Sequence, residues 1–403
     1  MDGAILKGLR VIEASAFVAA PLGGMTLAQL GAEVIRIDGL QGGLDYRRWP
    51  VSDDGTSLFW AGLNKSKRSV CLDLGSPQGR ELARALIVAP GEDAGILLTN
   101  LPPRGWLDYE ALRTERQDLI QLTVQGDRSG GSAVDYTVNP RLGLPYLTGP
   151  QATEGAVNHV LPAWDLITGQ MAALGLLAAE RQRRRQGTGQ HVKLALEDVA
   201  LAVMAHLGFL AEAQNGQQRQ RYGNDLFGAF GRDFLTGDGE RIMVVGLTLK
   251  QWRNLCEATG IVEQVRLLET RLGVDLSLEG ERFRAREELA ALIAPWVAAR
   301  TLAQLREAFD SCSVCWSRYQ SVSQLLHEDP ACSEANPMFR QLDQPGIGPV
   351  LSPAIPLRFD EQRLPAQPAP RLGADTEAVL TELLGLSCAE VGRLHDQGVV
   401  RCA

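Results

Sequence analysis

Residues 161–204 contain the feature that most constrains the fold, a long run of apolar and small residues that begins just after a single acid. From Leu166 to Ala179 nearly every residue is apolar or small, with Gln170 as the one large polar exception. This pattern predicts a helix that is buried on all sides. Asp165 stands where that helix begins. Free N–H groups and the positive dipole end of a first turn favour an ionised carboxylate by about 0.3–1 kcal/mol. We therefore expect Asp165 to be an ionised group between solvent and core, where a carboxylate can act as a nucleophile.

The position of Asp165 also fits a purely structural role, because Asp is common in first turns for capping and dipole reasons. On position alone this structural role is the stronger interpretation. His159 is the histidine nearest to Asp165 in sequence, and a surface-loop position is expected for it.

Composition narrows the class of protein. The chain has 403 residues, enough for two domains, and its 45% hydrophobic and 22% charged content is that of an ordinary soluble protein. A formal net charge of −8 argues against a main role in nucleic-acid binding, which needs a basic face. No secretory signal is expected in the first 17 residues, and no apolar run reaches the roughly 18 residues of a membrane span.

The seven cysteines are scattered and odd in number, so they do not predict a disulfide framework. A reduced, cytoplasmic protein is expected. Cys312 and Cys315 form a lone C-x-x-C pair, and no second pair lies near it at the spacing of a zinc site. We expect no metal.

The amino-terminal residues predict an α/β fold. A buried strand over 9–14 leads through a small-residue loop into a helix that ends near Gly31, and a second strand follows over 34–37. This β-α-β start is typical of a doubly wound domain. No G-x-G-x-x-G motif is present, so a dinucleotide is not indicated.

Further elements predict two domains. We expect a large domain that starts with residues 1–200, a linker over 201–224, a small α+β domain over 225–325, and a return segment over 326–403 that completes the large domain. Strands are expected over 94–99 and 119–124. A basic loop enters a strand near Lys67, and Lys67 by itself is expected on the surface.

Three stretches of the chain resemble the family III CoA-transferases, the CaiB/BaiF family. They are GLRVIEASAFVAAPLGGMTLAQLGAEVIRID at 8–38, LFWAGLNKSKRSVCLDL at 58–74, and the segment from Leu161 to Val199. In the last segment Asp165 is followed by a small-residue helix, R-x-x-x-G-x-G-Q, a strand and an acidic helix start. The resemblance implies a doubly wound, Rossmann-like large domain with a smaller α+β domain, in an interlocked homodimer.

The resemblance also implies the site. Asp165 matches the catalytic nucleophile of the family, and the substrate is a CoA thioester, with no permanently bound cofactor and no metal. The partners implied are an acyl-CoA and a second copy of the chain, with no nucleic acid and no membrane. Arg47 is proposed to hold a free carboxylate of the substrate, with Arg48 as the alternative in the same run. The positions that match CoA contacts are Phe17, Val18, Ala19, Leu72, Asn100, Leu101 and Arg104.

Several functions remain open within and beside this family. The chain is most similar to members that move CoA between the two carboxyl groups of one dicarboxylic acid, and a glycine-poor loop over 223–231 fits a closed pocket for such a reaction. An intermolecular transferase with a different acid acceptor is the first alternative. Racemases of the family carry a His-Asp pair where this chain has Val134 and Asp135, so one of the two groups needed for proton exchange is missing. A non-catalytic acyl-CoA-binding protein is disfavoured because Asp165 is present with its surroundings.

Overall fold

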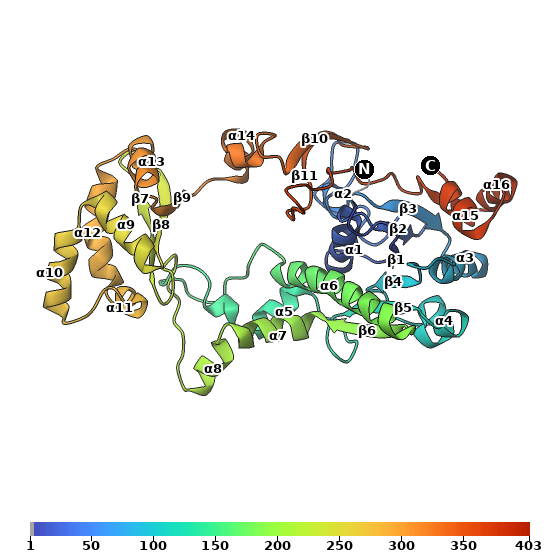
Figure 1. Ribbon diagram of the computed structural model, residues 1–403, viewed down its shortest axis with the longest axis horizontal. Helices are drawn as coiled ribbons and strands as arrows, with labels where there is room; N and C mark the ends of the chain where they lie inside the picture. The colour runs from blue at the N-terminus through green and yellow to red at the C-terminus, as the bar shows by residue number, and fades with distance from the viewer. Residues whose placement is uncertain (1–3) are drawn as a thin grey trace. The chain divides into compact units, whose positions relative to one another are not determined.

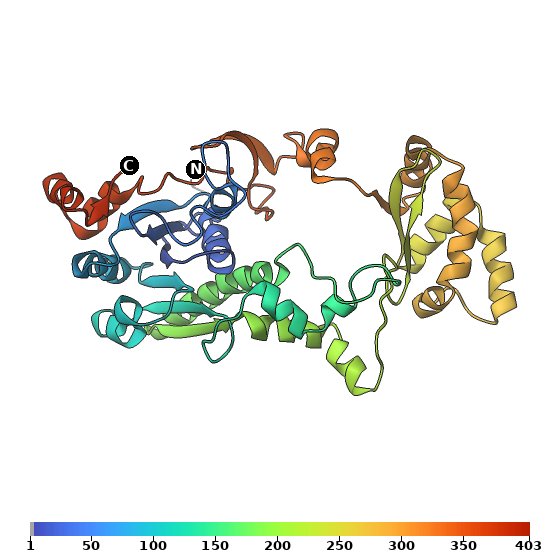
Figure 2. The same cartoon turned by 180° about the vertical axis from the view of Figure 1, so that it is seen from behind.

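The structure is a computed structural model that describes residues 4–403. Residues 1–3, which the expected large domain included, lie outside the described residues. The chain divides into two compact units (Figures 1 and 2). The first contains the described residues up to Leu142 together with Val160–Ala211 and Pro330–Ala403, and the second contains Gly143–His159 and Glu212–Asp329.

A seven-stranded sheet forms the centre of the first unit. Its strand order is β12-β3-β2-β1-β4-β5-β6, and all neighbours are parallel except β12, which runs antiparallel to β3. The order 3-2-1-4-5-6 is that of a doubly wound fold, so the expected α/β class is confirmed. The strands are β1 (Arg10–Ala14), β2 (Glu33–Asp38), β3 (Arg68–Leu72), β4 (Ile96–Thr99), β5 (Ile120–Gln125), β6 (Gln190–Ala195) and β12 (Val400–Arg401).

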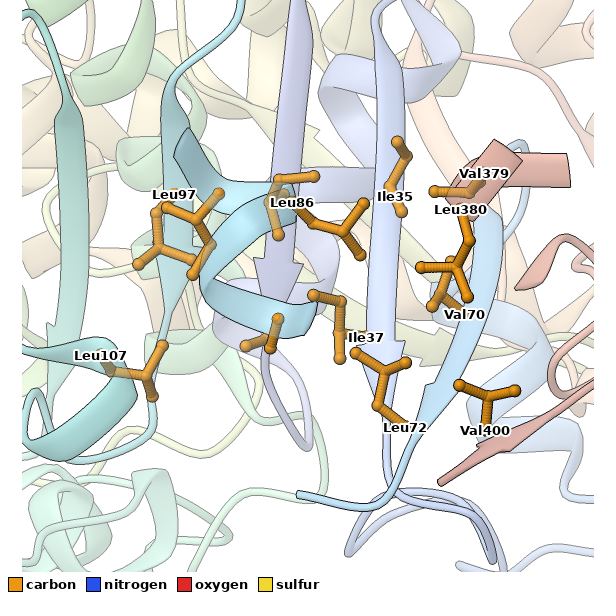
Figure 3. Close-up of a cluster of buried hydrophobic side chains, with 14 of the residues drawn as sticks. Ile35, Ile37, Val70, Leu72, Leu86, Leu97, Leu107, Val379, Leu380 and Val400 are labelled. Carbon is orange, nitrogen blue, oxygen red and sulfur yellow. The ribbon is translucent and has the colours of Figure 1, made fainter. Parts of the chain in front are cut away.

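Helices cover both faces of this sheet because successive strand residues point to opposite sides. In β1, Val11 packs into one core and Ile12 into the other. The core that contains Ile12 is drawn in Figure 3. Its helices are α3 (Pro77–Val88), α4 (Tyr109–Glu115), α15 (Thr376–Leu384) and α16 (Cys388–Asp396), whereas α1 (Ala19–Gln29) and α6 (Ala163–Gln186) cover the other face.

Helices α1 and α6 pack with their backbones close together. A Cβ atom added at Gly169 would lie 2.7 Å from the carbonyl oxygen of Ala19, and one added at Gly23 would lie 3.0 Å from the carbonyl oxygen of Gly169. Small residues at this crossing are therefore required, and they fix the start of α6 beside the start of α1.

The expectation that the helix after Asp165 is buried on all sides is wrong for one stripe. Ile167, Met171 and Leu174 are exposed, at the spacing of one helix face. Helices α1, α5 (Asp135–Arg141) and α7 (Leu196–His206) and the sheet cover the other sides of α6 within the first unit, whereas this apolar face stays open.

The first unit also contains further helices and a β-hairpin. These elements are α2 (Leu58–Leu63), α5 (Asp135–Arg141), α7 (Leu196–His206), the start of α8 (Phe209–Gln214), and the hairpin of β10 (Phe339–Gln344) and β11 (Gly348–Pro353). Two of its helices, α7 and α8, are separated near Gly208, which has a φ of +80°.

The second unit is the smaller α+β domain that the sequence predicted. An antiparallel sheet of β7 (Phe230–Leu235), β8 (Arg241–Gly246) and β9 (Cys315–Arg318) packs on helices around a core that includes Trp252, Leu289 and Phe309. The helices are α9 (Leu249–Thr259), α10 (Val262–Leu272), α11 (Glu279–Arg284), α12 (Arg286–Ala298), α13 (Leu302–Ser311) and α14 (Val322–Glu328).

The compact units differ from the expected domain limits at three places. The expected linker over 201–224 is divided between the units after Ala211, and residues 326–329 belong to the second unit. Residues 143–159 belong to the second unit, although the sequence-based division placed them in the large domain. Arg221 holds them there, because its guanidinium donates to the carbonyl oxygens of Pro145 at 3.0 Å and Gly155 at 2.8 Å, and also to that of Thr153. Contacts between residues so far apart in sequence leave no local signal. Within residues 4–403, no helix is long and apolar enough to cross a membrane.

Candidate active site

The loop between β1 and α1 is clamped from two sides at the carboxyl ends of the strands. The Asn100 side chain, just after β4, accepts the N–H of Ala16 at 2.9 Å and donates to the carbonyl oxygen of Ala16 at 2.7 Å. The N–H of Phe17 donates to Oδ2 of Asp45 at 2.9 Å. Phe17 has a φ of +68°, a left-handed conformation that costs free energy for a residue with a Cβ. The two clamps hold this strained loop at the point between β1 and β4 where ligands bind in doubly wound folds.

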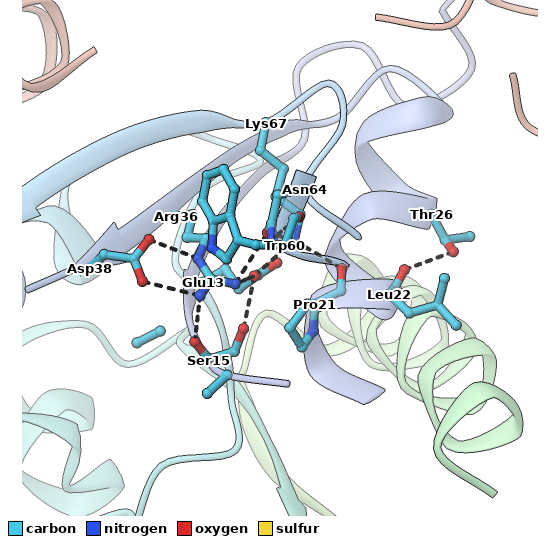
Figure 4. A network of polar contacts seen from close by, with 12 residues as sticks. Glu13, Ser15, Pro21, Leu22, Thr26, Arg36, Asp38, Trp60, Asn64 and Lys67 are labelled. Carbon is cyan, nitrogen blue, oxygen red and sulfur yellow. Dashed lines mark hydrogen bonds and ion pairs between the residues drawn. The ribbon is translucent and has the colours of Figure 1, made fainter. Parts of the chain in front are cut away.

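A buried polar network lies beneath this loop (Figure 4). Arg36 is its centre: the guanidinium contacts Asp38 at 2.8 Å, Asp45 at 3.1 Å and Glu13 at 3.3 Å. Lys67 donates to Glu13, to Asn64 and to the carbonyl oxygen of Pro21, each at 2.8 Å. Since Asp45 belongs to this network, the network fixes the Phe17 backbone.

Burial changes the protonation behaviour of this network. Removal from water raises the pKa of Asp45, and the charge of Arg36 opposes that rise. Burial lowers the pKa of Lys67 to about 8, and the carboxylate of Glu13 opposes that fall. The expectation that Lys67 lies on the surface is wrong, because its partner Glu13 lies 54 residues away in sequence.

Asp165 lies in the first turn of α6, but the free N–H groups of that turn go elsewhere. Oδ2 of Asp135 accepts the N–H of Trp164 at 2.7 Å and that of Asp165 at 3.3 Å. The N–H of Ala163 donates to the carbonyl oxygen of Leu161. Asp135, the first residue of α5, is therefore the capping carboxylate of α6, and Asp165 is not.

The pKa of Asp165 follows from this arrangement. Burial, and secondly the negative charge of Asp135, raise the pKa of Asp165 from 3.8 to about 7, while Arg48 acts in the opposite direction. The expectation that the helix start favours ionised Asp165 is wrong, since Asp135 takes the N–H groups that would have stabilised the charge. The result is a carboxylate that is poorly solvated and therefore more basic than an ordinary one.

Arg48 lies in the loop after β2 and its side chain is exposed. Its guanidinium lies 5.9 Å from the centre of the Phe17 ring and 5.1 Å from that of Phe59. Phe17 is thus the link between Arg48 and the start of α1, and α1 in turn contacts α6 one turn after Asp165.

The structure brings most of the predicted site residues to one edge of the sheet. Phe17, Val18 and Ala19 follow β1, Asn100, Leu101 and Arg104 follow β4, and Leu72 ends β3. The carboxyl ends of these parallel strands lie at the same edge of the sheet. Phe17 and Arg104 are exposed, Leu101 is half-buried, and Val18, Ala19 and Leu72 are buried. The Asn100 side chain is used for the Ala16 clamp, so its observed task is to position the loop.

The remaining predicted residues belong to other segments of the chain. Arg47 is exposed next to Arg48. His159 and the loop 223–231 belong to the second unit. Sequence reasoning missed the capping role of Asp135, although the change from His-Asp to Val-Asp had drawn attention to the position. In residues 4–403, no three His, Cys, Asp or Glu side chains are grouped to hold a metal ion.

Known proteins place this chain in a family. It is 60% identical to 2-methylfumaryl-CoA isomerase of Chloroflexus aurantiacus over 98% of both chains. It is 29% identical to succinate–glutarate CoA-transferase of Agrobacterium fabrum, over 94% of this chain and 95% of that protein. The crystal structure of a CaiB/BaiF family protein from Brucella suis has the same fold, with a TM-score of 0.76 at 24% identity over 94% of this chain and 99% of that one. Residues 6–376 match the model of CoA-transferase family III, and the chain therefore belongs to that family, also called CaiB/BaiF.

Proposed function

We propose that this protein is a 2-methylfumaryl-CoA isomerase, an intramolecular CoA-transferase that moves CoA between the C1 and C4 carboxyl groups of 2-methylfumarate (mesaconate). The observation that carries the proposal is the 60% identity to the Chloroflexus aurantiacus isomerase along 98% of both chains. The basic, poorly solvated carboxylate of Asp165 supplies the nucleophile that the reaction needs.

The first half of the reaction transfers CoA to the enzyme. One oxygen of Asp165 attacks the C1 thioester carbonyl, the C–S bond breaks, and a mixed anhydride and CoA thiolate form. The thiolate then attacks the aspartyl carbonyl of the anhydride. This step releases the C1 carboxylate and leaves CoA on Asp165 as a thioester.

The second half repeats these steps with the other end of the same acid. The C4 carboxylate attacks the aspartyl thioester and releases the thiolate, which then attacks the C4 carbonyl and restores the Asp165 carboxylate. Donor and acceptor are one molecule, so the effective concentration of the acceptor is that of a trapped intermediate.

The chain offers backbone donors for the oxyanions of these steps. Helix α1 begins at Ala19 without a side-chain cap, so the N–H groups at its start remain available to a ligand. Preorganised N–H donors of this kind stabilise the negative charge of a tetrahedral intermediate. The Asn100 contact with Ala16 and the Asp45 contact with Phe17 hold the strained loop, and so keep these donors in place.

The same proposal includes the CoA contacts and the assembly. Phe17, Val18, Ala19, Leu72, Leu101 and Arg104 contact CoA, and Asn100 holds the loop that they need. The protein is an interlocked homodimer in this proposal. The exposed apolar stripe on α6 supports a partner chain, because contiguous apolar surface of this kind marks interaction sites.

The test is to incubate the purified protein with 2-methylfumaryl-C1-CoA alone and to separate the C1 and C4 thioesters by chromatography. We expect the C4 isomer to form, with no label taken up from added isotope-labelled 2-methylfumarate. Asp165→Ala is expected to form no isomer, and its thermal unfolding curve checks that it folds.

Two outcomes contradict the proposal. Strong uptake of label would indicate an intermolecular transferase of the same family, a function supported by the similarity to succinate–glutarate CoA-transferase. No isomer at all with the wild-type protein would require a screen of other acids as acceptors.

A further inference from the structure

An intramolecular CoA-transferase must hold a dicarboxylate while CoA moves between its ends. At every stage one carboxyl group reacts near Asp165 and the other carries a full negative charge. Such a charge needs a cation that faces the nucleophile and is not neutralised by the protein. The identity of that cation matters only if the proposed function holds, and it therefore rests on that function.

Arg48 has the required position. Its backbone is fixed, because its N–H donates to the carbonyl oxygen of Asp45 at 3.0 Å and its own carbonyl oxygen accepts the Ser57 hydroxyl. Asp45 belongs to the buried network and also holds Phe17. The backbone of Arg48 and the loop beside Asp165 are therefore positioned by the same residue, Asp45, the first through its carbonyl oxygen and the second through its carboxylate.

The neighbours of the Arg48 guanidinium are aromatic. The faces of Phe17 and Phe59 attract it at 5.9 and 5.1 Å without cancelling its charge. In the part of the chain that the structure describes, Arg48 has no carboxylate within ion-pair distance. The Arg48 side chain is exposed, so it is open to an incoming anion.

The field at Asp165 separates Arg48 from Arg47. Arg48 lowers the pKa of Asp165, against the larger effects of burial and of Asp135, and its guanidinium also lies over Phe17, next to the start of α1. Arg47 instead acts on the pKa of Tyr46, a residue that also feels Arg401 and Asp38. The two neighbouring arginines thus act on different groups, Arg48 on Asp165 and Arg47 on Tyr46.

We propose that Arg48, and not Arg47, binds whichever carboxylate of the substrate is not reacting, and so keeps the free dicarboxylate in the site between the two halves of the reaction. In the first half Arg48 binds the C4 carboxylate. After CoA has moved to Asp165, the free acid turns end for end, so that Arg48 binds C1 while C4 attacks. Arg48 is a specificity-determining residue in this scheme, because a monocarboxylic acid offers it nothing to bind.

The experiment compares Arg48→Met with Arg181→Met. The second variant removes the same charge from an exposed position on α6 that lies about 24 Å from Asp165 along the helix axis, at a rise of about 1.5 Å per residue. We expect Arg48→Met to lower kcat/KM for 2-methylfumaryl-CoA by roughly 10- to 100-fold, the size of a lost charge-assisted contact, and Arg181→Met to leave it unchanged. Arg48→Lys is expected to recover part of the loss.

Two measurements distinguish a role of Arg48 in binding the substrate carboxylate from a purely structural role. Arg48→Met is expected to take up labelled 2-methylfumarate into the product, since the free acid now escapes between the halves, whereas the wild type takes up none. The second measurement uses 2-butenoyl-CoA, the CoA thioester of a monocarboxylic acid, and traps acylated Asp165 with hydroxylamine as its hydroxamate. At about pH 9, where Asp165 is ionised in both proteins, we expect the wild type and Arg48→Met to give equal amounts of hydroxamate.

Other results overturn the proposal. They are wild-type kcat/KM in Arg48→Met, an equal loss with 2-butenoyl-CoA, or a loss in Arg47→Met that Arg48→Met does not share. A wild-type protein that does not isomerise 2-methylfumaryl-CoA at all would instead refute the proposed function, so the two failures are distinguishable.

Discussion

The pKa of Asp165 leads to a direct test through its neighbour Asp135. Asp135 raises that pKa by its charge and caps α6 with Oδ2. The substitution Asp135→Asn removes the charge but keeps an oxygen that can accept the Trp164 N–H, and Asn is as good a cap as Asp. The variant therefore changes the electrostatics of the site with little change in geometry.

The size of the effect follows from Coulomb's law. At a separation of about 6 Å and an effective dielectric constant of about 20–40, two unit charges interact by about 1.4–2.8 kcal/mol, or about one to two pKa units. Asp135→Asn should thus bring the pKa of Asp165 down from about 7 to about 6 or below. At pH 6 the ionised fraction then rises from about one tenth to about one half, a five-fold gain.

The assay is the pH dependence of kcat/KM for isomerisation, which reports on groups of the free enzyme. We expect the acid limb of Asp135→Asn, normalised to its own plateau, to lie about one pH unit below that of the wild type. Asp108→Asn is the matched control, because Asp108 caps α4 through the Ala111 N–H at 2.9 Å and lies outside the site. An unchanged acid limb in Asp135→Asn, or one moved to higher pH, would refute the account of Asp165.

Three further substitutions, one of them with a matched control, test the network and the nucleophile. Glu13→Gln leaves buried Lys67 without its carboxylate, and we expect the free energy of unfolding, measured in urea, to fall by about 3–5 kcal/mol. Gly24→Ala would place a Cβ 1.7 Å from Oε2 of Glu13 and should cost about 3 kcal/mol or more, whereas Gly62→Ala meets nothing within 4 Å and should change stability by less than about 1 kcal/mol. Folding raises the pKa of Asp165 from 3.8 to about 7, so the ionised carboxyl costs stability as the pH rises through that range. Above pH 7, Asp165→Asn should therefore raise the thermal midpoint, with a gain in the free energy of unfolding of at most about 4 kcal/mol. Near pH 4 the substitution should have little effect.

Each of these expectations has a contradicting result. A loss below about 1 kcal/mol in Glu13→Gln would show that the buried charges are not coupled as described. Equal stabilities of the two glycine variants would mean that the Glu13 carboxylate does not occupy the space beside α1. A stability gain in Asp165→Asn that is the same at pH 4 and pH 8 would rule out titration of Asp165 as its cause.

The sequence allowed the large sheet and the place of Asp165 to be predicted, because both depend on local patterns. Buried strands and the β-α-β start are visible as apolar runs, and a small-residue helix after an acid is visible as composition. The family was recognised from three such stretches. Each of these signals lies within about 45 residues of chain, and none needs knowledge of a distant contact.

The parts of the site that escaped prediction all depend on distant contacts. Lys67 meets Glu13 across 54 residues, Asn100 clamps Ala16 across 84, and Asp135 caps Trp164 across 29. In each case a polar residue that would be ordinary on a surface is held by a partner that the fold brings near. Burial of such residues cannot be read from their own neighbours in sequence.

The capping of α6 explains why a helix start can hold a strong nucleophile. Had Asp165 accepted the free N–H groups of its own helix, its charge would have been stabilised, its pKa kept low and its electron pair made less reactive. Asp135 takes those N–H groups from Trp164 and Asp165, and its own charge then repels that of Asp165. The Asp135 carboxylate thus stabilises the start of the helix. The charge of Asp165 is left to be stabilised chiefly by bond formation with the substrate. Free energy that a cap would have given to the resting enzyme is in this way available to lower the barrier of the acyl transfer.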